Sequence, residues 1–254
     1  MLKDAPIIVT DFSGIFLYES FGLAYPCVHI SCCHMSGVRR YCDETALTVL
    51  RSLIAPYSYS GVHYIDTGDY HYMTKLWCEK IQKPFALIVF DHHPDMQPPA
   101  FGRILSCGSW VKEMLDTHPF LREVVIIGVA DKFTDKQEVG LYNVKIINEA
   151  SVRQGRAMDL LRTISFDVPI YISLDKDVLS REYIITNWSN GSLSLYTLCL
   201  MLQYLVESNK LLGIDICGGI EISNLVSCRQ IIQLNNNCNE KILSAIYDTK
   251  KASD

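Results

Sequence analysis

The sequence predicts an α/β protein with a mainly parallel, doubly wound sheet, and two observations lead to that prediction. Short apolar runs alternate with amphipathic segments along most of the 254 residues. The runs are continuous rather than interrupted by polar residues, which is typical of strands buried on both faces. Strands that alternate with helices indicate a parallel sheet covered by helices on both sides. Since neither a repeat nor a linker interrupts the pattern, we expect one domain over residues 1–254.

Each element follows from its own segment. Seven continuous apolar runs are expected as strands: 6–12, 61–66, 85–91, 123–130, 144–148, 168–175 and 210–216. Six amphipathic segments are expected as helices: 44–55, 72–82, 108–118, 151–164, 195–208 and 239–249. The triplet Asn235-Asn236-Asn237 is expected to be a loop before the last helix. In doubly wound sheets, ligands bind beyond the carboxyl ends of the strands.

Composition excludes several functional classes. The formal charge is −5 and Lys and Arg form no run, which argues against a nucleic-acid partner. No apolar stretch approaches the roughly 20 residues of a membrane span, so no membrane association is expected. The ten cysteines are scattered and form no CxxC pair. They are therefore expected to be mostly small core residues of a reduced, cytoplasmic protein.

Carboxylates stand at the ends of four expected strands, at Asp66, Asp91, Asp175 and Asp215. The strand at 85–91 leads into Asp91-His92-His93-Pro94-Asp95, and the strand at 168–175 leads into Lys176-Asp177. A solvated loop explains any one of these acids. Four together indicate a site at the edge of the sheet where ligands bind.

The spacing of these residues favours a metal site. Asp91, His93 and Asp95 would share one face of an extended segment, whereas His92 would point away and serve packing. Asp175 and Asp177 repeat the two-residue spacing. Carboxylates so close together would repel one another, and two divalent cations would remove that cost. Carboxylates with imidazoles suit manganese, with iron, zinc and magnesium as alternatives.

Four motifs together resemble the ureohydrolases, the family of arginase and agmatinase. They are GDYHY at 68–72, VFDHHPD at 89–95, ISLDKD at 172–177 and GIDI at 213–216. In that family a GGDH segment, DxHxD and SxDxD stand at strand ends in the same chain order. The resemblance implies a three-layer α/β/α fold with an eight-stranded, mainly parallel sheet, and relatives that are often homo-oligomers.

The resemblance also implies a site with two manganese ions. Asp91 and Asp175 would bridge both ions, and the other four ligands would divide between them: His71 and Asp95 on one, His93 and Asp177 on the other. The ions would share a bridging hydroxide that attacks a guanidinium or amide carbon of a small molecule. Asp95 would then pass a proton to the departing nitrogen.

The chain departs from the family where the substrate is bound. Tyr70 intrudes between Asp69 and His71, and Ser106-Cys107-Gly108 stands where the family has a histidine. Gly218 replaces the glutamate that grips the guanidinium, and Glu221 lies three residues later. We therefore expect substrate contacts from Asp215, Glu221 and Cys107, with Glu221 as a second catalytic residue beside Asp95. Arginine and agmatine themselves are not implied as substrates.

Three alternatives stay open. A histone-deacetylase-like amidohydrolase would use the tandem His92-His93 with a single zinc ion. A DHH-type phosphoesterase would explain the Asp91-His92-His93 triplet, although the C-terminal segment lacks the basic, glycine-rich character that such enzymes need. The third is a ureohydrolase-like protein that binds metal without catalysis.

Overall fold

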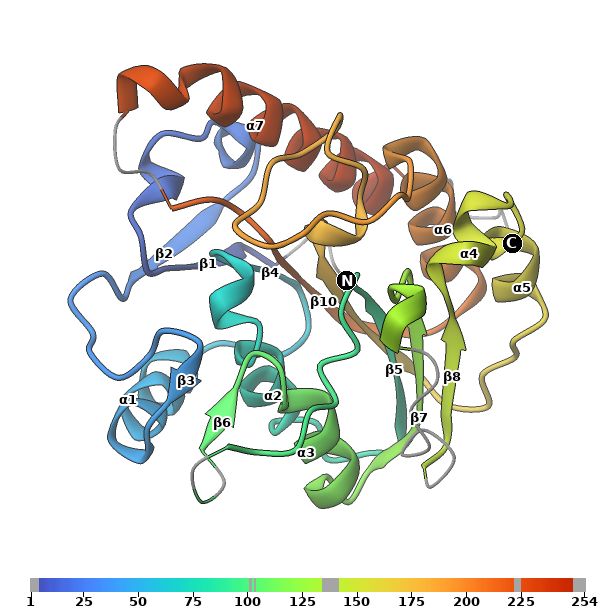
Figure 1. Ribbon diagram of the computed structural model, residues 1–254. Coiled ribbons are helices and arrows are strands. Elements are labelled where there is room, and N and C mark those ends of the chain that lie inside the picture. The colour runs from blue at the N-terminus through green and yellow to red at the C-terminus, as the bar shows by residue number, and fades with distance from the viewer. Residues whose placement is uncertain (1–4, 101, 103, 134–141, 222–224, 249–254) are drawn as a thin grey trace.

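Eight parallel strands form the central sheet of the computed structural model, which describes residues 5–100, 102, 104–133, 142–221 and 225–248 (Figure 1). Their order across the sheet is β2-β1-β4-β10-β9-β5-β7-β8. The strands are β1 (Ile7–Asp11), β2 (Cys27–Ser31), β4 (Val62–Ile65), β5 (Phe85–Phe90), β7 (Leu121–Ile127), β8 (Val144–Ile147), β9 (Ile170–Asp175) and β10 (Leu211–Cys217). β3 (Tyr41–Cys42) and β6 (Leu105–Ser106) form a separate antiparallel pair.

Helices cover both faces of this sheet (Figure 1). One face packs on α1 (Glu44–Ile54), α2 (Met73–Cys78) and α3 (Trp110–Thr117). The other packs on α4 (Glu149–Arg153), α5 (Ala157–Arg162), α6 (Leu195–Ser208) and α7 (Leu225–Tyr247). Short 3-10 turns connect the elements: η1 (Ile15–Leu17), η2 (Phe21–Ala24), η3 (Gly68–Tyr70), η4 (Asp131–Phe133) and η6 (Lys176–Val178). The predicted three-layer α/β/α fold is confirmed.

The core explains why the strands read as continuous apolar runs. Every residue of β5 is buried, and its side chains alternate between the two layers. Ile88 and Phe90 pack in the layer of α6 and α7, whereas Leu87 and Val89 pack in the layer of α1 to α3. A strand covered on both faces has no position for a solvated side chain, so its polar residues gather beyond its end.

All seven expected strands are present, and three expectations about the elements are wrong. The edge strand β2 was not expected, because Cys27–Ser31 is half exposed and mixes polar with apolar residues. The helix expected over 151–164 is two helices, α4 and α5, separated at Gly155 with φ 71°. The Asn235–Asn237 triplet lies inside α7 and forms no loop.

The site is expected where four central strands end. β4, β10, β9 and β5 are consecutive neighbours in the sheet, so their carboxyl ends meet at one edge. Within the described part of the chain, no helix is both long and apolar enough to span a membrane.

Candidate metal centre

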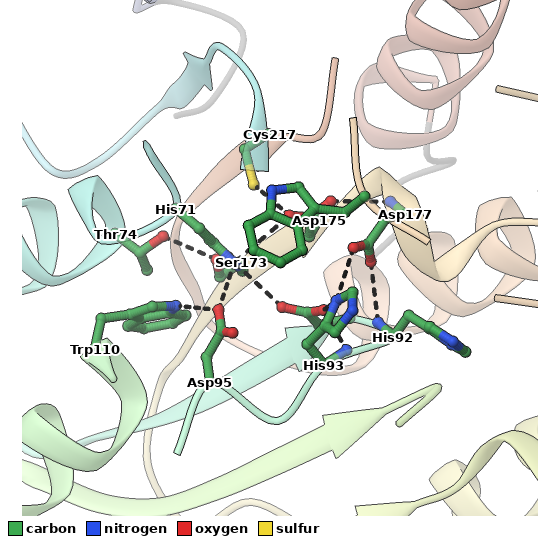
Figure 2. Close-up of polar contacts among 12 residues, drawn as sticks. His71, Thr74, His92, His93, Asp95, Trp110, Ser173, Asp175, Asp177 and Cys217 are labelled. Atoms are coloured by element: carbon green, nitrogen blue, oxygen red, sulfur yellow. Dashed lines mark hydrogen bonds and ion pairs between the residues drawn. The ribbon is translucent and has the colours of Figure 1, made fainter. Parts of the chain in front are cut away.

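Six side chains that the sequence proposed as metal ligands meet at this edge (Figure 2). The ring nitrogen Nδ1 of His71 lies 3.2 Å from Asp91 Oδ2 and 3.0 Å from Asp95 Oδ2. The ring nitrogen Nδ1 of His93 lies 3.4 Å from Asp91 Oδ1 and 2.9 Å from Asp177 Oδ2. Asp91 therefore joins two groups of potential ligands: one with His71 and Asp95, the other with His93 and Asp177.

His71 is held in the orientation that a metal ligand needs. Its Nε2 lies 2.9 Å from the hydroxyl of Ser173, which donates a 2.7 Å hydrogen bond to Asp215 Oδ1. Because that hydroxyl gives its proton to Asp215, it accepts one from Nε2 of His71. With a cation bound, Nδ1 would then offer it a lone pair from the side of the carboxylates. This buried nitrogen has no hydrogen-bond partner among the described residues, as expected of an atom that binds a cation.

Asp175 occupies a space that two glycines leave open. A Cβ atom at Gly68 would lie 2.7 Å from Asp175 Oδ2, and one at Gly218 would collide with Asp175 Oδ1. Gly218 also has φ 89°, a conformation that side chains rarely adopt. The thiol of Cys217 donates to Asp175 Oδ2 at 3.2 Å, and Asp175 Oδ1 accepts the backbone N–H of Asp177. In this backbone conformation, position 218 has no room for a side chain beside Asp175.

The charges of the cluster call for cations. Burial, followed by repulsion from Asp91, raises the pKa of Asp95 to about 6 and that of Asp175 above its usual range. Burial and then Asp175 raise the pKa of Asp177 well above its usual range. Two imidazoles and four carboxylates fit divalent cations by ligand type as well as by charge. The residues present therefore fit the two-metal group.

The local backbone brings Asp91, His93 and Asp95 together in a way that the sequence did not predict. The segment bends at His92 and His93 instead of continuing extended. Asp95 has φ 49°, in the left-handed region, and its Oδ2 accepts a 2.7 Å hydrogen bond from Trp110 Nε1. The predicted convergence is present, but the predicted extended geometry is wrong. The ring of His92 points away from the cluster, as expected (Figure 2).

Two acids of the strand-end pattern turn away from the cluster. Asp66 accepts the backbone N–H groups of Phe12 and Ser13, at 2.9 and 2.7 Å, and so fixes the loop after β1. Asp69 binds Arg39 and Arg40 at 3.0 and 3.1 Å. It also accepts a 2.9 Å hydrogen bond from the indole of Trp188. These positions are structural anchors beside the site.

A cavity of about 210 Å³ opens onto the ligand cluster. Among the described residues its wall consists of Arg40, Tyr41, Gly68, Asp91, His93, Asp95, Gln97, Ser106, Cys107, Gly108, Asp175, Asp177 and Trp188. Cavities for drug-sized ligands are larger, about 300 to 1,000 Å³, so this one suits a small molecule. Cys107 does line it, and burial raises the pKa of its thiol, which keeps the sulfur protonated.

The two acids expected to bind substrate lie elsewhere. Asp215 is fully buried behind Ser173, where Thr74 also donates to it at 3.0 Å. Glu221 is half exposed and ion-paired with Arg39 at 2.6 Å. Neither belongs to the wall of the cavity. Asp215 orients His71 through the hydroxyl of Ser173. Glu221 does not belong to the ligand cluster.

Sequence reasoning missed several residues of the site. Ser173 is the serine of the SLDKD motif, so the motif could have revealed it. Cys217 forms a third group of potential ligands with His71 and Asp175. No sequence pattern pointed to Arg40 or Trp188, because both reach the cavity from segments that lie outside the four motifs.

Comparisons with known proteins bear on the family and the fold. Residues 28–218 match the sequence profile described as the Arginase family. An uncharacterized protein of Thermotoga maritima is 32% identical over 244 residues, which cover 96% of this chain and 90% of the other.

Solved structures share the fold at low identity. The arginase of Bacillus cereus superposes with a TM-score of 0.72 at 14% identity, covering 98% of this chain and 99% of that one. The proclavaminate amidino hydrolase of Streptomyces clavuligerus has a TM-score of 0.66 at 16% identity, with 95% and 92% covered. The formimidoylglutamase of Bacillus subtilis has a TM-score of 0.65 at 14% identity, covering 98% of this chain and 88% of that one.

Proposed function

Because the chain belongs to the arginase family, we propose that it is a metal-dependent hydrolase that cleaves a C–N bond of a small guanidino, amidino or amide compound. The observation that carries this proposal is the double ligand cluster around Asp91, with the buried Nδ1 of His71 lying 3.2 Å from Asp91 Oδ2 and 3.0 Å from Asp95 Oδ2. The named solved relatives include hydrolases of guanidino and formimidoyl compounds, which supports the same reaction class.

Six residues would hold two divalent cations, with manganese as the expected metal. His71 and Asp95 would serve one ion, His93 and Asp177 the other, and Asp91 both. Asp175, which is grouped with His71, would serve both ions by analogy with the family. Such a pair of cations supplies an activated water at neutral pH and polarises the group under attack.

The chain's own residues would orient the reaction. Trp110 fixes one oxygen of Asp95 by its 2.7 Å hydrogen bond, which leaves the other oxygen to pass a proton to the leaving nitrogen. Ser173 and Asp215 keep His71 in the tautomer that can bind metal. The half-buried indole of Trp188 stands beside His93, 5.5 Å between ring centroids, and narrows access of water to the cavity.

The tandem histidines provide a matched test. We would remove metal with a chelator, reload with manganese and measure urea or ammonia release from a panel of guanidino, amidino and amide compounds. Turnover should require manganese, and His93→Asn should reduce it by more than about 100-fold, since losing only an outer partner of a ligand costs 10–100-fold.

His92→Asn is the control, because the ring of His92 points away from the cluster while its backbone N–H binds Asp177. It should retain most of the turnover. Equal losses in both variants would favour the deacetylase-like use of both histidines. Metal binding without turnover on the whole panel would refute catalysis and favour a non-catalytic protein of this fold.

A further inference from the structure

The wall of the cavity also carries a basic side chain that does not belong to the ligand cluster. Arg40 is the one cation of that wall among the described residues, and the metal ligands are its only acids there. Two divalent cations would balance the four ligand carboxylates. Asp69 is shared between Arg39 and Arg40, so the basic group left on the cavity wall to meet a substrate is the guanidinium of Arg40. We propose that the substrate carries a carboxylate away from the bond that is cleaved, and that Arg40 binds it. This inference rests on the proposed function.

Arg40 is held firmly at its place. Its backbone N–H donates to Asp69 O at 3.1 Å, and its carbonyl accepts the N–H of Cys107 at 2.9 Å. Its Nε binds Asp69 Oδ1 at 3.1 Å, and its guanidinium lies 5.2 Å from the ring centre of Trp188. Asp69 and Trp188 bind each other as well, so the three side chains form one unit. A side chain fixed in this way loses little freedom when it binds a ligand.

The backbone at Arg40 supports a functional reason for this residue. Its φ is 60°, a left-handed conformation that glycine adopts freely and arginine does not. Strained backbone of this kind is typical of functional sites. The antiparallel β3–β6 pair, which begins at the next residue, holds the strained position against the segment that carries Cys107.

The free end of the guanidinium suits a carboxylate. Only Nε is engaged by Asp69, and the two terminal nitrogens of Arg40 have no partner among the described residues. Two parallel N–H groups of arginine match the two oxygens of a carboxylate. Arg40 also lies on the wall of the cavity together with the neutral polar side chains of Gln97 and Ser106.

Among the described residues, the wall of this cavity carries no acid outside the ligand cluster that could hold a cationic tail. Glu221 is neutralised by Arg39, and Asp215 is buried behind Ser173. The expectation that acids hold a cationic group is therefore reversed here.

Two probes of similar size and opposite charge test the inference: 4-guanidinobutyrate, which ends in a carboxylate, and agmatine, which ends in an ammonium group. Binding of each to the manganese-loaded protein would be measured by calorimetric titration, and hydrolysis by urea release. The acid should bind more tightly than the amine. Arg40→Gln should weaken binding of the acid by about 10- to 100-fold, because a hydrogen-bonded ion pair is lost, and should leave the amine unchanged or improved.

Arg39→Gln is the matched control. Arg39 is the neighbouring arginine and binds the same Asp69 carboxylate, but it does not line the cavity. It should leave binding of the acid within about 3-fold of wild type. Arg40→Gly is a second variant whose backbone adopts φ 60° without strain, so a loss of binding in it is not due to a strained backbone.

The outcomes separate this inference from the proposed function. Hydrolysis of the amine in preference to the acid, or equal effects of the two arginine variants, would overturn the inference and leave the hydrolase proposal standing. Binding of the acid that depends on Arg40, without any hydrolysis, would support the inference while refuting catalysis on these compounds. Binding of neither probe would overturn the inference.

Discussion

The two ring nitrogens of His71 have different surroundings, and the difference sets what the residue can do. Nε2 is hydrogen-bonded to the hydroxyl of Ser173, which in turn donates a hydrogen bond to Asp215. Nδ1 faces the carboxylates of Asp91, Asp95 and Asp175. Burial raises the pKa of Asp215 to about 6, and the hydrogen bonds from Ser173 and Thr74 oppose that rise. Asp215 thus acts through His71 as a positioning residue.

Removal of the Ser173 hydroxyl should weaken metal binding. In Ser173→Ala the imidazole loses the partner that fixes its tautomer, and we expect manganese affinity to fall about 10- to 100-fold. The measurement is a competition titration with a metal-sensitive chelator. Ser192→Ala is the control, since the Ser192 hydroxyl is buried with no hydrogen-bond partner among the described residues. Equal affinity in the two variants would contradict the role given to Ser173.

The sequence could identify the acids and histidines of the proposed metal site but not the rest of the cavity, for a physical reason. Asp91, His93, Asp95, Asp175 and Asp177 stand directly after buried strands, so the strand order alone brings them together. Arg40 and Trp188 are placed by long-range contacts with Asp69, which no local pattern encodes. Asp215 looked available because it stands near a strand end, yet it faces inward.

At the scale of the element, α7 shows how tertiary contacts override local preference. Asn235 accepts the backbone N–H of Ile185 at 3.0 Å and donates to the carbonyl of the same residue at 2.8 Å. Asn236 accepts the N–H groups of Ser20 and Phe21, both at 2.7 Å. Asparagine favours turns and loops, which is why the triplet predicted a loop. In the structure, Asn235 and Asn236 instead form hydrogen bonds with the backbone of the segments that pack on α7. Only such distant backbone groups explain a helix through three asparagines.

The asparagine triplet supplies a stability test with its own control. Asn236→Ala should lower the free energy of unfolding by about 1–3 kcal/mol, because the buried N–H of Phe21 and the partly buried N–H of Ser20 lose their acceptor. Asn237→Ala, at the exposed position of the triplet, should change it by no more than about 0.5 kcal/mol, since alanine is the better helix former. The measurement is urea unfolding of both variants. A similar loss in both would contradict the assignment.

The strands were predictable where burial is complete and not where it is partial. β5 and β9 are buried throughout and were expected from their apolar runs. β2 lies at the edge of the sheet, with a half-exposed mixture of side chains that has no clear period. The prediction of one helix over residues 151–164 failed because a single residue, Gly155, separates α4 from α5.

At the scale of the whole molecule, a polar chain links the sheet edge to the outer helix layer. Lys176, between the proposed ligands Asp175 and Asp177, donates to Asn239 of α7 at 2.7 Å, and Asn239 donates to Glu19 at 2.7 Å. Burial raises the pKa of Glu19 to about 7, although Lys176 and the bond from Asn239 favour its charged form. Stability should therefore depend on the protonation of this one carboxyl group.

The sign of that dependence follows from linkage. Between pH 4.5 and 7 the unfolded chain releases the Glu19 proton while the folded protein keeps it, so the free energy of unfolding falls as the pH rises. Glu19→Gln cannot ionise, and it should be more stable than wild type by about 1–3 kcal/mol at pH 8 and nearly equal at pH 4. Urea unfolding of both proteins at the two pH values measures this. If Glu19→Gln differed from wild type in its free energy of unfolding by the same amount at pH 4 and at pH 8, the role given to Glu19 would be contradicted.

The central claim is that the sheet edge holds two metal ions joined through Asp91, and metal content tests it most directly. The measurement is elemental analysis of protein purified without chelator and incubated with manganese, for wild type, Asp91→Asn and the exposed control Asp159→Asn. We predict about two manganese ions per chain in wild type and control, and fewer than one in Asp91→Asn, because Asp91 belongs to both ligand groups. One ion per chain in wild type, or none after incubation, would contradict the account.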